Sequence, residues 1–421
     1  MRRLRFCMVS TFYPPYSYGG DGITVQRLAR ALVGAGHDVT VVHDADAYAA
    51  LGHPPPDAVR EASDGIDVVT LRSAAPRLSA LLTHQTGRPV VQGRAISRFL
   101  ASGEFDVVHF HNVSLVGGVG VLSCAPAGAA TLYTAHEHWL ICPTHVLWRH
   151  RREPCDKREC VRCSLRYHRP PQLWRQTDFF ERQLRHVDTF IALSEFSRGK
   201  HREFGFPFPM DVLPPLVADA PLVAGDEAAS PHPRPYFLCV ARLEPIKGLH
   251  TVIPLFQSDA PADLIIAGAG SQEAELRALA GNSSRIHFIG RLTSEQLWRY
   301  YRHAIAHIAA SICYETFGNT IVEAFQQATP VVARRRGPFP ELVEQASAGM
   351  LFSDDGELRQ ALASLAADPA ARDRLGDAGR RAYEARWCEG AVLPQYLEIV
   401  ERTRAQGRDR PASSPVVAVA P

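Results

Sequence analysis

Two glutamates eight positions apart, Glu315 and Glu323, mark the segment of this sequence with the clearest chemical pattern. Glu315 is expected in a loop that follows a buried strand, where a carboxylate can accept hydrogen bonds from hydroxyl groups. Gly318, Asn319 and Thr320 are expected where the next helix begins, and backbone N–H groups without partners favour an anion there. The segment therefore predicts a site for a ligand that carries both hydroxyl groups and phosphate.

The same segment allows a purely structural interpretation of Glu323. Thr320 followed three residues later by a glutamate is the signature of a capping box, in which two side chains satisfy backbone N–H groups of the first helical turn. The pattern alone does not separate capping from ligand binding, and both interpretations stay open at this point.

Cations and glycines near other predicted strand ends could complete an anion site. Arg242 and Lys247 follow the predicted strand 236–240 at its carboxyl end, the edge at which open α/β sheets bind ligands. Gly19 and Gly20 precede the first predicted helix, where the lack of a Cβ lets the backbone approach a phosphate closely. The alternatives are a solvated loop for the cations and an ordinary strand-to-helix turn for the glycines.

Four of the nine cysteines are concentrated in one stretch of the chain. Cys142, Cys155, Cys160 and Cys163 are separated by twelve, four and two residues. Four thiolates with a closing Cys-x-x-Cys pair can build a tetrahedral zinc site, which would order a loop that lacks its own core. Reduced free thiols or a redox pair, and an iron–sulfur cluster, are the alternatives. The other five cysteines are scattered singly, which favours a reducing compartment.

Parallel α/β sheets are the elements expected to position all these residues. Helical spacing separates a first series of strand-like runs at 4–9, 39–42, 67–71, 106–110, 130–133 and 189–193. A second series follows at 236–240, 264–267, 286–289, 306–310, 330–333 and 350–352. The predicted fold class is α/β, with two doubly wound, Rossmann-like domains that face each other across a cleft formed by the loops at the carboxyl ends of the strands.

Changes in composition predict the boundaries of five segments: 1–214, 215–235, 236–385, 386–406 and 407–421. The first is an N-terminal domain with a cysteine-rich, basic insertion at 142–169. The second is a linker rich in Pro and Ala, and the third is a C-terminal domain. The fourth is a helix with Leu, Tyr and Val at helical spacing, and the last is expected to be a disordered tail.

The overall composition excludes several classes of protein. With 421 residues, 46% hydrophobic and 21% charged, the chain is not wholly disordered, collagenous or a coiled coil. A formal net charge of +2 is too small for a dedicated nucleic-acid binder, so no nucleic-acid partner is expected. The first apolar run is too short for a signal peptide, and the uncharged stretch 113–135 contains Pro126 and predicts a buried helix and strand. The expected location is the cytoplasm.

The motif that runs from Glu315 to Glu323 resembles the signature of the retaining glycosyltransferases of family 4, which have the GT-B fold. The resemblance covers nearly the whole chain, because a Tyr-Pro-Pro and Gly-Gly loop, Arg242 and Lys247, Gly268-Ala269-Gly270, Ile289-Gly290-Arg291-Leu292 and Pro340-Glu341 also match in order. No third glycine of a dinucleotide fingerprint follows Gly270, which weakens a dehydrogenase interpretation.

This resemblance implies roles for the residues of the donor site. Arg242 and Lys247 would clamp the diphosphate of a nucleotide-sugar donor, Glu323 would bind the ribose, and Glu315 would bind sugar hydroxyls. The same site would be lined by Phe317, Gly318, Asn319 and Thr320. The backbone at Arg291 and Leu292 would meet the base. Catalysis is expected without a metal, because cations and helix N-termini can stabilise the leaving diphosphate.

A histidine is expected on the opposite wall of the cleft. His136 follows the predicted strand 130–133, and by the resemblance it would contact the donor sugar near the reacting carbon. The family usually has Asp at the next position, where this chain has Glu137, so the role of that residue is in doubt. A structural histidine is the alternative for His136, and His111, at the end of another strand, is a weaker candidate for the acceptor side.

The implied activity is transfer of a sugar, with retention of anomeric configuration, to a hydroxyl of a sugar, glycolipid or small-molecule acceptor. The N-terminal domain would be the acceptor side, and the helix 386–406 would cross back onto it. The stretch 149–169 holds eight Lys or Arg against three acidic residues, which would attract an anionic acceptor or a membrane face. A solvated loop is the alternative there.

Two other kinds of function fit the same fold. A sugar phosphorylase or a nucleotide-sugar epimerase would use a similar site, and a non-catalytic nucleotide-sugar binding protein would bind the donor without turning it over. The complete set of Arg242, Lys247, Glu315 and Glu323 argues against the non-catalytic alternative.

Overall fold

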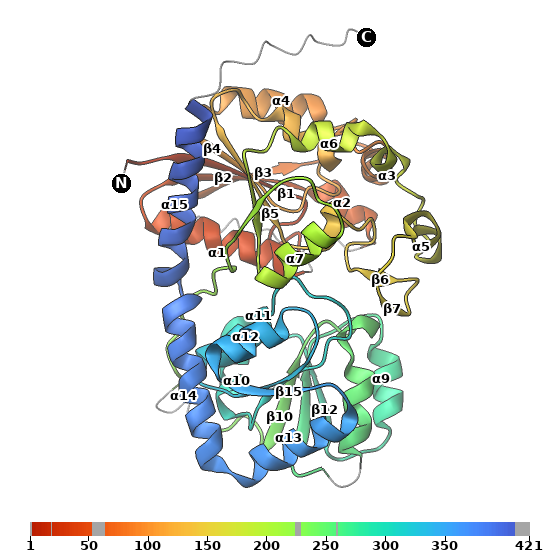
Figure 1. Ribbon diagram of the computed structural model, residues 1–421, viewed down its shortest axis with the longest axis vertical. Coiled ribbons are helices and arrows are strands. Elements are labelled where there is room, and N and C mark those ends of the chain that lie inside the picture. The colour runs from red at the N-terminus through yellow and green to blue at the C-terminus, as the bar shows by residue number, and fades with distance from the viewer. Residues whose placement is uncertain (1, 18, 53–63, 224–228, 258–259, 409–421) are drawn as a thin grey trace.

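The computed structural model describes residues 2–17, 19–52, 64–223, 229–257 and 260–408. Two parallel β-sheets, each flanked by helices, lie one above the other along the longest axis of the molecule (Figure 1). The N-terminal sheet is the upper one in this view, and the C-terminal sheet is the lower one. Each region is an α/β layer structure, so the predicted fold class is confirmed.

The N-terminal sheet has seven parallel strands. In spatial order they are β3 (Ile66–Leu71), β2 (Asp38–Asp44), β1 (Arg5–Ser10), β4 (Val107–Phe110), β5 (Ala130–Ala135), β8 (Thr189–Ala192) and β9 (Met210–Val212). Its α-helices are α1 (Gly20–Gly34), α2 (Ala45–Ala50), α3 (Pro76–Thr86), α4 (Gly93–Ser102), α6 (Asp178–Leu184) and α7 (Glu195–Glu203). Short 3₁₀ helices are η1 (Gly118–Cys124), η2 (His138–Leu140) and η3 (Leu173–Gln176).

The C-terminal sheet has six parallel strands. In spatial order they are β12 (Ile286–Gly290), β11 (Asp263–Ala267), β10 (Tyr236–Val240), β13 (His307–Ala309), β14 (Val331–Arg334) and β15 (Gly349–Phe352). Its first helices are η5 (Pro245–Lys247), α8 (Leu249–Val252), η6 (Ile253–Phe256), α9 (Glu273–Ala280) and α10 (Ser294–His303). The later ones are α11 (Asn319–Gln326), α12 (Phe339–Ala346), α13 (Asp355–Ala367), α14 (Pro369–Arg386) and α15 (Glu389–Arg408).

Apolar residues cover both faces of the N-terminal sheet, as a sheet between two helical layers requires. Along β1, Phe6 and Met8 belong to the cluster on one face, while Cys7 and Val9 belong to the cluster on the other. This alternation follows from the two-residue period of a strand, which turns successive side chains to opposite faces. The sheet is therefore fixed in one register between two hydrophobic cores.

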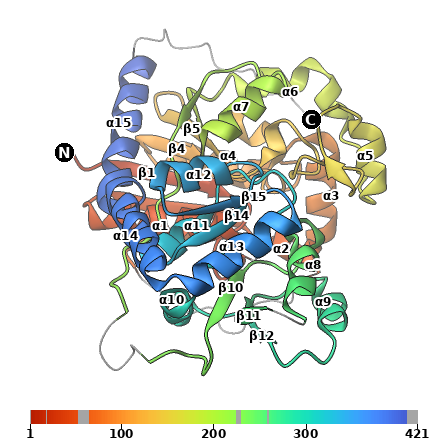
Figure 2. The same cartoon turned by 60° about the horizontal axis from the view of Figure 1, so that its bottom comes forward.

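The last helix joins the two regions. Figures 1 and 2 show α14 and α15 running one after the other along the same side of the molecule, α14 beside the lower sheet and α15 beside the upper one. Tyr396 and Val400 of α15 are fully buried in the same cluster as Leu4, Phe6 and Val25. The helix that contains these residues thus completes a core of the N-terminal region.

Both sheets reverse their strand order at one point, and this places the cleft. The reversal lies between β1 and β4 in the N-terminal sheet and between β10 and β13 in the C-terminal sheet. At such a point the loops leave the sheet in opposite directions and open a crevice at the carboxyl ends of the strands. The loops after these four strands carry most of the residues that the sequence singled out.

Some local features were not predicted. A short antiparallel pair, β6 (Trp148–Arg149) and β7 (Glu153–Pro154), and one helix, α5 (Cys160–Arg166), form the cysteine-rich insertion. Strand β9 extends the N-terminal sheet, and the helix expected in the uncharged stretch 113–135 is the 3₁₀ helix η1. Among the described residues, none of the helices has both the length and the apolar composition needed to cross a membrane. The tail expected from residue 407 lies almost entirely outside the described residues.

Candidate active site

Loops from both sheets line one cavity of about 380 Å³. The loop after β1 contributes Gly19 and Gly20, the loop after β5 contributes His136, and the loop after β10 contributes Arg242. The cavity therefore lies where the switch points of the two sheets face each other. The other predicted site residues that line it are Lys247, Glu315, Phe317, Gly318, Asn319 and Thr320.

Three predicted donor residues do not line this cavity. Arg291 is exposed and Leu292 is half-buried in the segment after β12. Glu323 lies on α11, in the second turn behind the cavity wall, with 18% of its side chain exposed. The structure thus brings the predicted diphosphate and sugar residues together, whereas the residues assigned to the base and the ribose lie at or beyond the border of the cavity.

An ion pair joins two of the charged residues predicted to act on the donor. Lys247 Nζ lies 2.6 Å from Glu315 Oε1, and Ser311 Oγ donates to the same oxygen at 2.7 Å. Burial raises the pKa of Glu315, but Lys247 and Ser311 outweigh it, so the pKa lies below its usual value and the carboxylate is charged. Both hydrogen bonds go to Oε1, which leaves Oε2 for a further donor.

A glycine allows this pair to form. Lys247 ends η5, and Gly248 follows with a φ of +72°. A Cβ at Gly248 would lie 2.2 Å from the carbonyl oxygen of Ala310, which comes directly after β13. Only glycine lets the loop after β10 pack this closely on the end of β13, and that packing places Lys247 beside Glu315.

Positive electrostatic potential dominates the C-terminal wall of the cavity. Arg242 has no ion pair within the described residues, and its charge lowers the pKa of Glu315 and partly offsets the burial that raises the pKa of Asp21. Helix α11 begins beside it after Gly318, and no side chain caps this N-terminus. The N–H groups of Asn319 and Thr320 therefore have no partner within the helix and favour an anion, whereas that of Ile321 donates to the carbonyl of Gly318 at 3.0 Å. A Cβ at Gly318 would lie 2.8 Å from Leu342, so a side chain at this position would require the buried Leu342 to shift.

The capping-box interpretation of Glu323 is wrong. Thr320 Oγ1 bonds to His307 Nε2 at 3.1 Å instead of to a backbone N–H group. Glu323 Oε1 pairs with Arg27 of α1 at 3.0 Å, and Tyr301 donates to its other oxygen at 3.4 Å. The glutamate therefore ties α11 of the C-terminal region to α1 of the N-terminal region, an interaction between residues far apart in the sequence.

His136 faces the cavity from the N-terminal wall as a neutral ring. Burial lowers its pKa to about 4, and its Nε2 atom lies 2.9 Å from Nδ1 of His111. Thr316, next to Glu315, donates to the backbone carbonyl of His136 at 2.8 Å. The histidine is thus held on one side by a second buried histidine and on the other by the loop of the glutamate motif.

Sequence reasoning missed several polar residues of the N-terminal wall. Asp21 lines the cavity, and burial and the nearby Glu137 raise its pKa, although Asn112 donates to it at 3.0 Å. Glu137 pairs with His145 at 2.6 Å, and both line the cavity. Asp21 could have been found from its place in the first turn after the Gly-Gly pair. His145 comes from the insertion and had no sequence signal.

Comparison with known proteins agrees with this architecture. The model of Glycosyltransferase Family 4 matches residues 18–220, and the model of Glycosyl transferases group 1 matches residues 226–382. The sucrose-phosphate synthase structure from Thermosynechococcus elongatus superposes with a TM-score of 0.68 at 21% identity, covering 96% of this chain and 100% of that one. Two facing Rossmann-like regions with a cleft between them form the GT-B fold.

Two curated relatives match along almost their whole length. The chain is 28% identical to the MMP α-(1→4)-mannosyltransferase of Mycolicibacterium hassiacum, covering 92% of this chain and 96% of the relative. It is 24% identical to the phosphatidyl-myo-inositol mannosyltransferase of Mycolicibacterium smegmatis, covering 93% of each. The chain belongs to the family 4 glycosyltransferases, as its motifs predicted. It is an enzyme that transfers a sugar from a nucleotide-sugar donor.

Proposed function

We propose that this enzyme transfers a sugar with retention of anomeric configuration to an anionic acceptor, and that mannose from GDP-mannose is its donor sugar. The observation that carries the donor site is the convergence of Arg242, Lys247 and the uncapped N-terminus of α11 on one cavity. Cleavage of a nucleotide diphosphate sugar builds negative charge on the departing diphosphate, and preorganised cations and N–H groups stabilise that charge.

The ion pair of Lys247 also fits a phosphate site. An ammonium group has three N–H donors, and Glu315 takes one of them, so two remain for diphosphate oxygens. The free Oε2 of Glu315 can accept a hydrogen bond from a sugar hydroxyl. These residues would act without a catalytic metal, because the protein itself supplies the positive charge at the leaving group.

The N-terminal wall supports the sugar end of the donor. His136 is neutral and half-buried, so it can donate to or accept from a hydroxyl without adding charge near the reacting carbon. The Gly-Gly loop lies beside α11, where a Cβ at Gly20 would be at an ordinary contact distance of 3.5 Å from the side-chain nitrogen of Asn319. In this proposal the donor is clasped between the Gly-Gly loop and α11, and Glu323 binds the ribose after it leaves Arg27.

The identity of the donor rests on the relatives. Those of M. hassiacum and M. smegmatis are named mannosyltransferases, and a relative from Mycobacterium tuberculosis, 30% identical over 48% of this chain, is named for GDP-mannose. Retention is the stereochemical course that the family signature at Glu315 to Glu323 implies.

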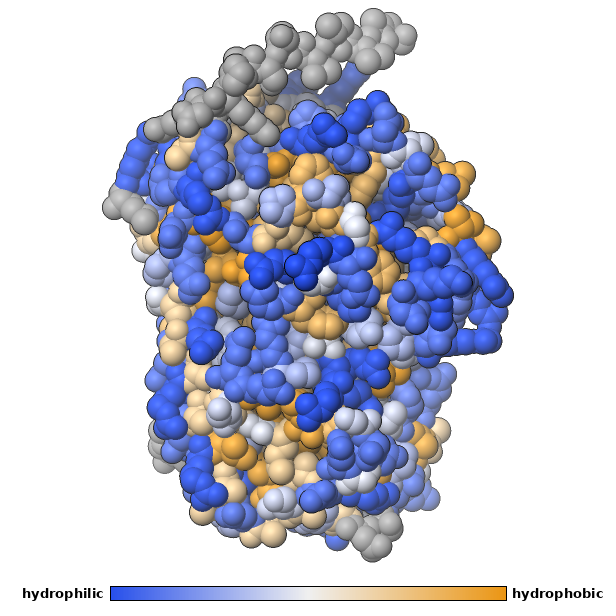
Figure 3. Space-filling model, viewed as in Figure 1, coloured by the Kyte–Doolittle hydropathy of each residue, from blue (hydrophilic) through white to orange (hydrophobic). Residues whose placement is uncertain are grey.

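The surface of the N-terminal region supports an acceptor at a membrane face. Residues 72–103 contain five arginines and no acidic residue. Leu78 and Leu81 on α3, Leu165 on α5 and Leu173 on η3 are each at least half exposed. Trp174 of η3 donates to the carbonyl of His84 on α3 at 3.0 Å, so these two helices lie together. Figure 3 shows apolar residues at the upper right edge, where Figure 1 places α5. Exposed leucines among arginines fit an anionic lipid surface.

Product analysis tests the proposal. The purified chain is incubated with GDP-mannose, UDP-glucose or UDP-N-acetylglucosamine, and with phosphatidylinositol vesicles, phosphatidylcholine vesicles or mannose 1-phosphate as acceptors. Release of GDP that needs an anionic acceptor, with an α-linked product by NMR, is the expected result. A β-linked product would exclude retention, and equal turnover with neutral acceptors would exclude the anionic preference. Turnover with orthophosphate alone would indicate a phosphorylase.

A further inference from the structure

The cysteine-rich insertion is built from very short elements. Between β5 and α6 the chain forms the two-residue strands β6 and β7 and the seven-residue helix α5. Cys142 precedes this hairpin, Cys155 follows β7 directly, and Cys160 and Cys163 lie in the first turn of α5. The hairpin and the helix therefore bring cysteines from three different places in the segment to one small subdomain.

The backbone of the insertion contains most of the strained residues of the structure. Five of the eight non-glycine residues with positive φ in the described part of the chain lie in this segment, namely His145, Leu147, His150, Arg151 and His168. A left-handed conformation costs an L-residue roughly 1–2 kcal/mol, so surrounding interactions must impose it. Two strands of two residues and one short helix provide few such interactions, which indicates that another constraint fixes the fold of the insertion.

The four cysteines belong to one small subdomain. All four are free, and the backbone N–H of His150 donates to Sγ of Cys163 at 3.4 Å, as backbone N–H groups do to bound thiolates. Cys142 lies in the N-terminal hydrophobic core and Cys155 packs against the same core, while Cys160 lines a neighbouring cavity.

A buried cationic atom lies beside this subdomain. Arg175 lines the same cavity as Cys160, and its Nη2 atom is buried and has no hydrogen-bond partner in the described part of the chain. Its guanidinium lies over the ring of Trp139 at 4.6 Å and over that of Trp174 at 4.8 Å. A buried guanidinium requires a counter-charge, and a metal bound by four thiolates carries a net negative charge.

We propose that Cys142, Cys155, Cys160 and Cys163 bind one Zn²⁺ ion that fixes the insertion. Zinc takes four thiolates in a tetrahedron at about 2.3 Å, which places the sulfur atoms about 3.8 Å apart. In the described residues no three of these sulfur atoms lie within 4.8 Å of one another, so binding draws the hairpin and α5 together. Metal binding is then coupled to ordering of the subdomain, as in other small zinc modules.

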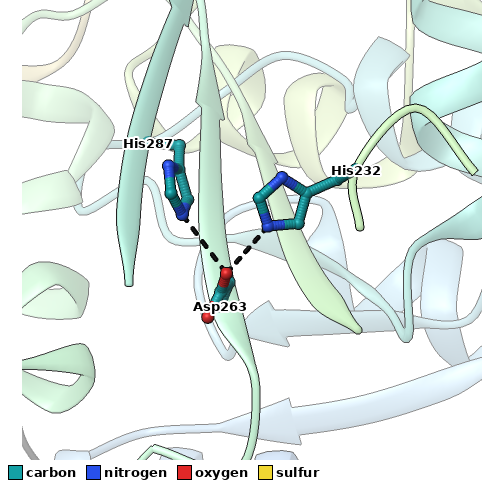
Figure 4. A group of neighbouring side chains, drawn as sticks. All are labelled: His232, Asp263 and His287. Carbon is teal, nitrogen blue, oxygen red and sulfur yellow. Dashed lines mark hydrogen bonds and ion pairs between the residues drawn. The ribbon is translucent and has the colours of Figure 1, made fainter. Parts of the chain in front are cut away.

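Three other side chains lie close enough together to bind a metal, but an arginine already pairs with their carboxylate. His232, Asp263 and His287 place their ligand atoms within 4.8 Å of one another on the C-terminal sheet (Figure 4). Arg234 donates to the same Asp263 oxygen at 2.8 Å, so the carboxylate already has a positive partner. Both histidines also point their Nε2 atoms at this oxygen, and the group forms a closed hydrogen-bond network.

The insertion reaches the active-site cavity through Cys142. Its backbone N–H donates to the carbonyl of His138 at 2.8 Å, and its carbonyl accepts from His145 at 3.0 Å. His145 and Val146 line the cavity, and His145 pairs with Glu137. The proposed zinc ion therefore holds one wall of the cavity, although it lies outside it and takes no part in sugar transfer.

Elemental analysis of the purified full chain tests the metal without any substrate, so its outcome is independent of the proposed function. We expect about one equivalent of zinc, which a mercurial thiol reagent releases. Reconstitution with Co²⁺ should give a thiolate-to-cobalt charge-transfer band. Ellman's reagent under native conditions should react with more thiols after the metal is removed by a chelator.

Serine variants assign the ligands. Cys142→Ser, Cys155→Ser, Cys160→Ser and Cys163→Ser should each lower the zinc content at least tenfold, whereas Cys124→Ser and Cys388→Ser, which replace half-buried cysteines elsewhere, should retain it. Folded wild-type protein with less than a tenth of an equivalent of zinc would overturn the proposal. Iron together with acid-labile sulfide would show an iron–sulfur cluster and overturn the zinc assignment. Retention of zinc in the Cys160 and Cys163 variants would exclude these two residues as ligands.

Discussion

The two walls of the active-site cavity are built in different ways. The C-terminal wall consists of strand ends and one helix N-terminus, and glycines at 248 and 318 let these elements approach each other closely. The N-terminal wall consists of the Gly-Gly loop, buried histidines and a strained insertion with two-residue strands. The C-terminal wall depends on interactions between regular elements, whereas the N-terminal wall depends on long-range contacts and, in our proposal, on a metal. Binding of the leaving diphosphate should therefore be sensitive to single charges, and binding of the acceptor to the integrity of the insertion.

The largest expected effect is on the C-terminal wall. Lys247→Ala should lower kcat/KM by about 10²-fold or more, because the leaving diphosphate loses a cation and Glu315 loses its partner. Steady-state kinetics with saturating acceptor measures this effect. Arg277→Ala removes a surface cation of the same region that pairs with Glu273, and it should change the rate less than about twofold. Equal rates for wild type and Lys247→Ala would remove Lys247 from the site.

Removal of the proposed zinc ion should affect the N-terminal wall. Chelation, or Cys155→Ser, should raise the KM for the acceptor by about tenfold while the donor KM changes less than about twofold, because only the wall that carries His145 relaxes. Kinetics with one substrate varied at a time separates the two constants. Cys124→Ser is the matched control. Equal increases in both KM values would mean that the insertion supports the whole cavity and not one wall.

The ion pair between Arg27 and Glu323 joins the two walls, and removing one partner or the other should change the donor KM in opposite directions. Glu323→Ala should raise the donor KM by about tenfold through the loss of a ribose partner. Arg27→Ala should lower it by about threefold, since Glu323 no longer has to leave an ion pair before it binds the ribose. Isothermal titration with the nucleoside diphosphate measures both. If both variants weaken binding, Arg27 orients Glu323 and does not compete with the ligand.

The smallest expected effect concerns pH. Burial lowers the pKa of His136 to about 4 and that of His111 well below its usual value, so neither ring titrates between pH 6 and pH 8. The value of kcat/KM should vary less than about twofold across this range and fall only as the pH approaches about 4, where His136 gains a proton. A pH–rate profile checks this. An inflection near pH 6.5 that disappears in His136→Gln would show that the ring is solvated during catalysis.

The C-terminal wall of the cavity could be predicted from the sequence because the motifs that mark it are local. The motif that begins at Glu315 lies within one loop and the helix after it. The cations follow the strand at 236–240. The alternation of strands with helices can be recognised from neighbouring elements. Their order along the chain fixes which loops share the carboxyl edge of a parallel sheet. The prediction therefore placed Arg242, Lys247 and Glu315 on one cavity before any contact was known.

The remaining features depend on contacts that a local pattern cannot contain. The capping-box interpretation of Glu323 failed because its partner, Arg27, comes from the other region of the molecule. Glu137 and His145 meet only through the insertion, whose two-residue strands are too short for a periodic signal. The four cysteines were visible as a pattern, but spacing alone left their chemistry open.

The return of α15 onto the N-terminal sheet has a consequence for synthesis of the protein. Tyr396 donates to or accepts from His109 of β4 at 2.9 Å, and Val400 is buried against the first strand. Helix α1 covers part of this apolar face, but while the chain emerges from the ribosome the part that α15 covers stays exposed until the whole second sheet has been translated. Nascent chains therefore expose a binding surface for chaperones throughout that interval, and the first region to be synthesised is among the last to reach its final stability.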